Sequence, residues 1–115
     1  MIVAVPSTDG NAESKIESRF GRAGQFILYD TETKEIKVQN NEQNKASARG
    51  AGIQTAEMIV NSGAKAVITV HCGPKAFRVL EAAGVEIYTF LDGTIMQAIA
   101  KFESGNLPRL ENPNN

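Results

Sequence analysis

Residues 66–90, AVITVHCGPKAFRVLEAAGVEIYTF, decide the fold of this 115-residue chain. The run Ala66–Val70 is short, apolar and rich in β-branched residues, which is typical of a strand buried on both faces. Pro74 suits the first position of a helix, because the N–H that proline lacks would have no partner there. A helix over Lys75–Ala83 then leads into a second strand, Val85–Phe90. This order predicts parallel strands joined by a right-handed crossover.

A similar helix precedes this unit. Ile53, Ala56 and Val60 recur at helical spacing and predict a helix that ends at Ser62, where the following glycine suits a left-handed cap. This helix leads into the first of the two strands. The polar segment Asn40–Arg49 before it is either a solvated connector or a loop that covers a ligand.

The remaining elements complete a mixed sheet. Ile2–Val5 predicts a buried strand, and a long polar loop follows it. Gly24–Asp30 and Glu35–Gln39 flank a short polar turn and predict an antiparallel hairpin. Thr94 and Gln97 have the spacing of a capping box at the start of a last helix. We therefore predict an α/β domain with a mixed, mostly parallel sheet of about five strands, flanked by helices.

The composition bounds both the domain and its function. With 42% hydrophobic and 22% charged residues in 12.4 kDa, the chain resembles an ordinary globular domain, predicted over residues 1–110 with a flexible tail at 111–115. The net charge of -1 gives no electrostatic reason to bind nucleic acid or an anionic membrane. No apolar run is long enough to cross a bilayer, and the lone Cys72 excludes an internal disulfide. We expect a cytoplasmic protein in a reducing compartment.

Glycines and cations gather where the predicted loops meet helices. Open α/β sheets bind ligands beyond the carboxyl ends of their parallel strands, and small residues at a helix start leave backbone N–H groups open to an anion. The sequence therefore predicts a small anion site formed by Gly50, Gly52, Gly73, Arg22, Arg49 and Lys75. The alternative is that the glycines serve packing alone, because Gly-x-Gly before a helix is common and the rest of a dinucleotide-binding fingerprint is missing.

His71 and Cys72 are the candidate metal ligands. Imidazole and thiolate suit iron, copper or zinc, but adjacent residues of a strand point to opposite faces, so both reach one metal only if the backbone turns there. The following Gly73 and Pro74 are consistent with such a turn. The alternative is a cysteine packed beneath a helix and a histidine at a strand end. Cysteine-based catalysis is disfavoured, because the only histidine is the immediate neighbour of Cys72 and is poorly placed as its base.

Several segments together form a specific series. They are Phe20–Ala23, Phe26, Tyr29 with Asp30, Gly50–Glu57 and Gly73–Ala76. With this series the chain resembles the dinitrogenase iron-molybdenum cofactor biosynthesis family over nearly its whole length. The resemblance implies a fold related to ribonuclease H, without the acidic catalytic residues of that enzyme. It also implies a non-enzymatic role, namely binding or carrying an anionic iron- or molybdenum-containing metal-sulfur cluster or its precursor.

One position departs from the family pattern. Many members carry histidine directly before the Phe-Gly pair, where this chain has Arg19, and arginine neutralises charge but offers a metal no lone pair. A cluster would then be held by hydrogen bonds and charge, or by His71 and Cys72, or the site binds something else. The partner that the resemblance implies is a cofactor-assembly protein, with the carrier a monomer or a homodimer.

Two rival hypotheses remain. In the first, the same helix starts form a metal-free binding or regulatory module for a small organic or phosphorylated anion. In the second, the chain is an interaction domain whose exposed edge strand, Glu35–Gln39, pairs with a second copy or with a partner.

Overall fold

The computed structural model describes residues 1–114 of the chain. Its strands are β1 (Ile2–Ser7), β2 (Gln25–Asp30), β3 (Ile36–Asn40), β4 (Ala64–Thr69) and β5 (Glu86–Thr89). Its helices are α1 (Glu42–Lys45), α2 (Ala51–Asn61), α3 (Pro74–Ala82) and α4 (Ile95–Glu103), together with a 3-10 turn, η1 (Phe20–Arg22). In the described part of the chain, no helix has both the length and the apolar character needed to cross a membrane.

The five strands form one sheet in the order β3-β2-β1-β4-β5. β1 is parallel to β4, and β4 is parallel to β5, whereas β2 is antiparallel to both β1 and β3. The β2–β3 hairpin and the β4–α3–β5 crossover are those predicted from the sequence. The predicted fold class, an α/β domain with a mixed five-stranded sheet flanked by helices, is confirmed.

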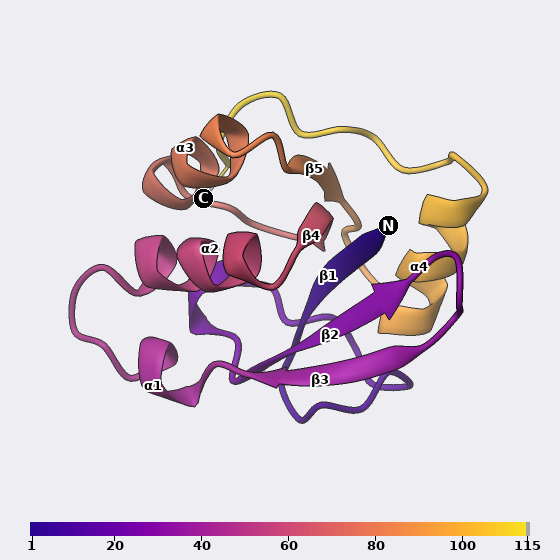
Figure 1. Ribbon diagram of the computed structural model, residues 1–115, viewed down its shortest axis with the longest axis horizontal. Coiled ribbons are helices and arrows are strands. Elements are labelled where there is room, and N and C mark those ends of the chain that lie inside the picture. Colours follow the sequence, from indigo (N-terminus) through magenta and orange to yellow (C-terminus); the bar gives the residue numbers. More distant parts are fainter. Residues whose placement is uncertain (115) are drawn as a thin grey trace.

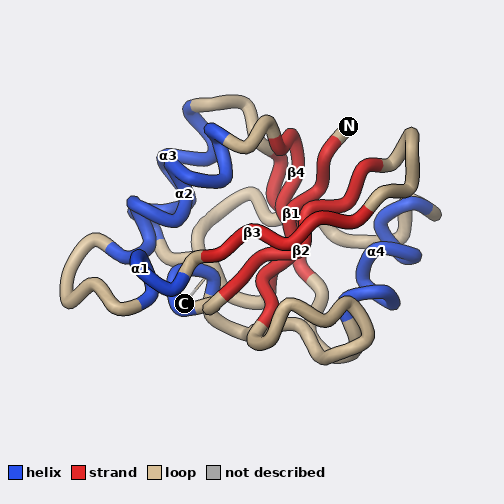
Figure 2. The backbone as a smooth tube through the Cα atoms, turned by 60° about the horizontal axis from the view of Figure 1, so that its bottom comes forward, coloured by secondary structure: helices blue, strands red, loops and turns tan. Residues whose placement is uncertain are grey.

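Helices cover both faces of the sheet (Figures 1 and 2). α2 and α3 lie on one face and α4 lies on the other. Along β1 the side chains alternate, so that Ala4 packs with the α2 and α3 side, whereas Val3 and Val5 pack with the α4 side. All three are fully buried, which explains why this strand reads as a continuous apolar run.

The helix boundaries follow local signals in the sequence. α3 begins with Pro74, as predicted, and the Thr94 capping box at the start of α4 is present. Gly63 has φ +86, which confirms the left-handed cap after α2. α2 begins at Ala51 instead of the predicted Ile53, so the Gly-x-Gly stretch forms the first turn of the helix itself.

The polar connector between β3 and α2 is anchored to the domain. Asn41 is only 2% exposed, and its side-chain amide donates to the Ala23 carbonyl (2.8 Å) and to Thr55 Oγ1 (3.1 Å). The interpretation of this segment as a merely solvated connector is therefore wrong at Asn41. Its buried hydrogen bonds join residues far apart in the sequence, and composition alone does not reveal them.

The segment after α4 returns across the molecule, drawn in yellow in Figure 1. Its residues 108–110 lie against β5, since Thr89 N–H donates to Pro108 C=O (3.0 Å) and Leu110 N–H donates to Ile87 C=O (2.7 Å). Further on, Asn114 pairs with the backbone of Cys72. Within the predicted tail, Asn114 thus pairs with the domain, whereas Asn115 lies outside the described residues.

The two edges of the sheet are treated differently. The segment 108–110 covers the β5 edge, whereas β3 is an exposed edge strand. The side chains of Ile36 and Val38 on β3 are 43% and 53% exposed. The edge strand predicted as an interaction surface is therefore at an edge, and it carries apolar side chains in contact with solvent.

Candidate functional site

A pocket of about 420 Å³ lies beyond the carboxyl end of β4, between η1 and the first turns of α2 and α3. Every residue predicted for the anion site lines it, and His71 lines it as well: Arg22, Arg49, Gly50, Gly52, Gly73 and Lys75. Cys72 does not line it. Three segments that are distant in sequence thus meet where the topology of an α/β sheet places ligands.

Two helix N-termini open into this pocket. The N-cap residues are Gly50 for α2 and Gly73 for α3, and neither helix has a side-chain cap. The first intrahelical bonds are donated by Gln54 to Gly50 and by Phe77 to Gly73. The N–H groups before these donors have no acceptor inside their helices, so they and the positive ends of both helix dipoles are directed towards the pocket.

The pocket is electrically positive although the chain has a net charge of -1. Arg19, Arg22, Arg49 and Lys75 line it, and no Asp or Glu of the described residues does. The ion pairs within residues 1–114 leave all four cations without a carboxylate partner. An anion that enters this pocket therefore meets unneutralised positive charge.

Arg22 has a second role that the sequence did not reveal. Its guanidinium donates from one nitrogen to the carbonyls of Lys45 (2.7 Å) and Ser47 (2.9 Å). The half-buried side chain therefore holds the connector that carries Arg49 to the pocket. Removing Arg22 would change the wall of the pocket as well as its charge.

Glycine at position 21 permits a close backbone approach beside the pocket. A Cβ on Gly21 would lie 2.9 Å from the Cα of Gly52, closer than real Cβ atoms come to backbone. Gly50 has φ +75, in the left-handed region that favours glycine. The sequence offered packing and anion binding as alternatives for this stretch; the structure shows the tight packing and, in the same turn, the open helix start. The sequence places Gly21 in the Phe20–Ala23 series but does not show this contact with Gly52.

His71 and Cys72 point in different directions. His71 N–H donates to Ser18 C=O and its carbonyl accepts from Phe20 N–H, whereas the backbone of Cys72 pairs with Asn114 on the other side. The chain is therefore extended here and its side chains alternate. The His71 side chain is exposed at the pocket and Cys72 is fully buried.

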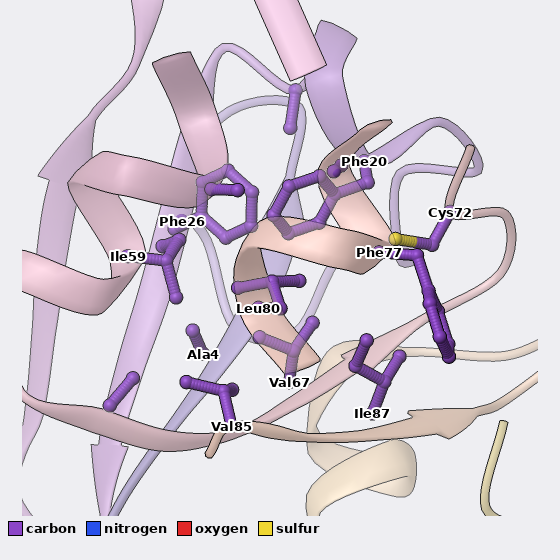
Figure 3. Packing of buried hydrophobic residues seen from close by; sticks show 14 residues of the cluster. Ala4, Phe20, Phe26, Ile59, Val67, Cys72, Phe77, Leu80, Val85 and Ile87 are labelled. Carbon is purple, nitrogen blue, oxygen red and sulfur yellow. The ribbon is translucent and has the colours of Figure 1, made fainter. Parts of the chain in front are cut away.

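The thiol belongs to the hydrophobic core between the sheet and α3. Figure 3 shows the Cys72 sulfur among Phe20, Phe77 and the other core side chains. Burial raises the pKa of Cys72 from its ordinary value of 9.0 to about 12, so the thiolate that a metal needs is disfavoured. The pairing of His71 with Cys72 as ligands of one metal is thus not formed, because the expected turn between them is absent.

The described residues also contain no group of three or more His, Cys, Asp and Glu side chains that could hold a metal ion. Direct ligation at the pocket is limited to His71 in this arrangement. The donors that the pocket does offer are backbone N–H groups, guanidinium groups and an ammonium group. This donor set suits an anion with hydrogen-bond acceptors on its surface.

Relatives of the chain were found at the level of sequence. It is 32% identical over 113 residues to the uncharacterized protein MJ0580 of Methanocaldococcus jannaschii, a match that covers 96% of this chain and 92% of that protein. A family model described as dinitrogenase iron-molybdenum cofactor matches residues 1–105.

Solved structures resemble this one over almost the whole chain. The apo form of the orange protein from Desulfovibrio gigas has a TM-score of 0.95 and 34% identity, covering 99% of this chain and 96% of that one. A NifB-like protein from Thermotoga has a TM-score of 0.87 and 37% identity, with coverage of 99% and 97%. With a family model matching residues 1–105 and these relatives, the chain belongs to the dinitrogenase iron-molybdenum cofactor family.

Proposed function

We propose that the chain binds and carries an anionic iron- or molybdenum-containing metal-sulfur cluster, or its precursor, without chemical turnover. One observation carries the proposal: two helix starts without side-chain caps share a pocket with four cations and no lining carboxylate. Membership of the family supports the class of cargo. No cysteine thiolate ligates the cargo in this arrangement, because the one cysteine lies in the core.

Each donor in the pocket matches a feature of such a cargo. Bridging sulfides and molybdate-like oxygens accept hydrogen bonds, which the N–H groups of Gly52 and Lys75 supply at the helix starts. Arg22, Arg49 and Lys75 neutralise the negative charge. His71 is the one imidazole at the pocket and is available to a metal atom at the surface of the cargo.

The carrier works in the cytoplasm and exchanges its cargo with a cofactor-assembly protein, as a monomer or a homodimer. No catalytic role is assigned to the pocket, since its function is retention. Arg19, Arg49 and Lys75 are exposed to solvent, where salt screens their charge, so retention is sensitive to ionic strength.

A direct test uses tetrathiomolybdate as the probe under anaerobic conditions, alone and with iron or copper salts. The chain should co-elute with a visible chromophore in gel filtration, and added salt should weaken its binding. Arg49→Ala and Lys75→Ala should each weaken binding about tenfold, because each removes a charge-assisted contact. Lys65→Ala is the matched control, since Lys65 is an exposed lysine near the opposite end of β4 that does not line the pocket.

A metal-free function remains the second candidate, because the same N–H and cationic groups would hold a phosphorylated or carboxylated anion. The absence of a three-donor metal group among the described residues favours it. Thermal shift separates the two candidates. Stabilisation by phosphate compounds but none by tetrathiomolybdate would refute the cluster carrier and support the metal-free module.

A further inference from the structure

Segment 71–73 is extended, and His71 and Gly73 of this segment form one wall of the pocket. Backbone hydrogen bonds hold the segment from both sides. On one side, His71 pairs with the segment before η1: its N–H donates to Ser18 C=O (2.9 Å), and its C=O accepts from Phe20 N–H (3.2 Å). On the other side, Cys72 pairs with Asn114. Neighbouring residues of an extended chain direct their backbone groups to opposite sides, so both pairings fit only while segment 71–73 stays extended.

Asn114 uses both its backbone and its side chain for this contact. Its N–H donates to Cys72 C=O, and its C=O and Oδ1 both accept from Cys72 N–H, each at 2.9 Å. Its side-chain amide also donates to Val70 C=O (3.0 Å). Cys72 and Asn114 are 42 positions apart in the sequence, so this is a tertiary contact that holds segment 71–73.

The segment that carries Asn114 is itself fixed to the sheet. Pro108 and Leu110 make backbone hydrogen bonds with β5, and Arg109 forms an ion pair with Glu86 (3.5 Å). Leu110 also packs against the core that contains Cys72. An anchored segment thus holds Asn114 beside segment 71–73.

We propose that Asn114 is a positioning residue that keeps segment 71–73 extended, so that His71 faces the pocket and the Cys72 thiol faces the core. The extended backbone fixes the alternation of these two side chains. Without the Asn114 side chain, Val70 C=O loses its amide donor, and Cys72 N–H keeps only the backbone carbonyl of residue 114 as its acceptor. Segment 71–73 can then rearrange, and the thiol gains access to solvent beside the start of α3.

The effect on cargo rests on the proposed function, whereas the effect on the thiol does not. The wall formed by His71 and Gly73 contributes to the pocket, so loosening it should weaken retention of the cargo. The segment 108–114 thereby links a distant part of the chain to the pocket. Release of segment 108–114 would expose the Cys72 thiol beside the His71 imidazole in this wall of the pocket.

The first measurement is the rate at which Cys72 reacts with 5,5′-dithiobis(2-nitrobenzoate). Asn114→Ala should react about tenfold faster than the wild-type protein, because local opening no longer has to break the side-chain bonds to Val70 and Cys72. Asn112→Ala is the matched control, since Asn112 is exposed and makes no side-chain hydrogen bond within residues 1–114. Asn114→Asp keeps an acceptor for Cys72 N–H and should react at an intermediate rate.

Dependence on urea separates a local role from general destabilisation. In Asn114→Ala, a rate that barely changes at low urea concentration identifies local opening, whereas a steep rise identifies global unfolding. If Asn114→Ala does not fold, as judged by circular dichroism, Asn114→Asp against Asn112→Ala decides the question. Equal rates in the Asn114 variants and Asn112→Ala, or acceleration through global unfolding alone, would overturn the inference.

Tetrathiomolybdate binding is the second measurement. Asn114→Ala should bind it several-fold more weakly than Asn112→Ala does, and Asn114→Asp should lie between them. If the wild-type protein binds no tetrathiomolybdate while the labelling rates differ as expected, the proposed cargo is wrong and the positioning role stands. If binding occurs but the labelling rates are equal, the positioning role is wrong and the cargo stands.

Discussion

The helices on the two faces of the sheet differ in whether their first backbone N–H groups have hydrogen-bond acceptors. At α4, Thr94 Oγ1 accepts from Gln97 N–H (3.1 Å), and Gln97 Oε1 accepts from Thr94 N–H (2.9 Å). The next free donors, Ile95 N–H and Met96 N–H, donate to carbonyls of the long loop after β1, at 2.9 and 3.1 Å. At α2 and α3, glycine stands at the N-cap and provides no side-chain acceptor.

This difference shows that the open helix starts are a local feature of the pocket. A chain that satisfies all the donors at one helix start could use the same residue types at the other two. Instead, the pocket side combines open donors with cations and small residues. The donors left over by folding are thus concentrated where an anion can enter.

The largest expected effect comes from giving α3 a side-chain N-cap, as α4 has. Gly73 has φ -70 and no atom within 4 Å of an added Cβ, so Gly73→Asp fits and its carboxylate would accept from the first N–H groups of α3. We expect about a hundredfold weaker tetrathiomolybdate binding, because the carboxylate occupies the donors and repels the anion, while the free energy of unfolding rises by about 0.5–1 kcal/mol. Titration and urea denaturation measure both effects.

Gly73→Ala is the control for that experiment. It adds the Cβ without the carboxylate and should leave binding nearly unchanged. Unaltered binding in Gly73→Asp would show that the start of α3 does not take part in holding the anion.

A second change tests the packing that keeps α2 open. In Gly21→Ala the new Cβ would meet the Gly52 backbone at 2.9 Å, so the turn and the helix must move apart. We expect the free energy of unfolding to fall by about 2 kcal/mol, and binding to weaken with it. Urea denaturation checks the first effect; a loss no greater than that of Gly73→Ala would contradict the close approach.

A third change removes the side-chain cap of α4. Thr94→Ala removes the acceptor for Gln97 N–H and should lower the free energy of unfolding by about 1 kcal/mol. Tetrathiomolybdate binding should not change, because α4 lies on the other face of the sheet from α2 and α3. Weaker binding in Thr94→Ala would mean that the start of α4 influences the pocket, so the capped and uncapped helix starts would not be independent.

The smallest effect concerns pH and the core beneath the pocket. Burial raises the pKa of Cys72 from 9.0 to about 12, so the folded state favours the neutral thiol. The stability that this contributes is complete below pH 9 and is lost as the pH rises towards 12. Near pH 9.5 the loss amounts to about 1 kcal/mol or less.

Cys72→Ala should lack this pH dependence, although the variant is less stable at neutral pH because of the cavity. The comparison therefore uses slopes of unfolding free energy between pH 8 and about pH 10, measured by urea denaturation. Equal slopes in the two proteins would mean that the thiol is not held in the core.

Much of this arrangement follows from local signals, and the rest does not. The Thr94 and Gln97 box, Pro74 at a helix start and the meeting of Gly52 with Gly73 were predictable, because capping, proline geometry and sheet topology act over short stretches or by general rule. Three details depend on pairs that are distant in sequence. They are the bonds of Arg22 to the connector, the approach of Gly21 to Gly52, and Asn114 against Cys72.

The orientation of Cys72 shows what such a detail decides. Sequence spacing correctly gave the alternation of His71 and Cys72 but allowed a turn to bring both side chains together. The residue that keeps the chain extended there is Asn114, and nothing near Cys72 in the sequence points to it. The candidate anion site was therefore predictable as a set of residues, whereas the division between pocket and core was not.

The covered β5 edge has a consequence for self-association. Within residues 1–114, segment 108–110 covers the β5 edge of the sheet, which leaves the β3 edge for strand addition. A molecule with two uncovered sheet edges could add copies without limit and grow into a filament. A molecule with one uncovered edge pairs once and stops. Crowded conditions should therefore yield closed pairs of this protein and no fibres.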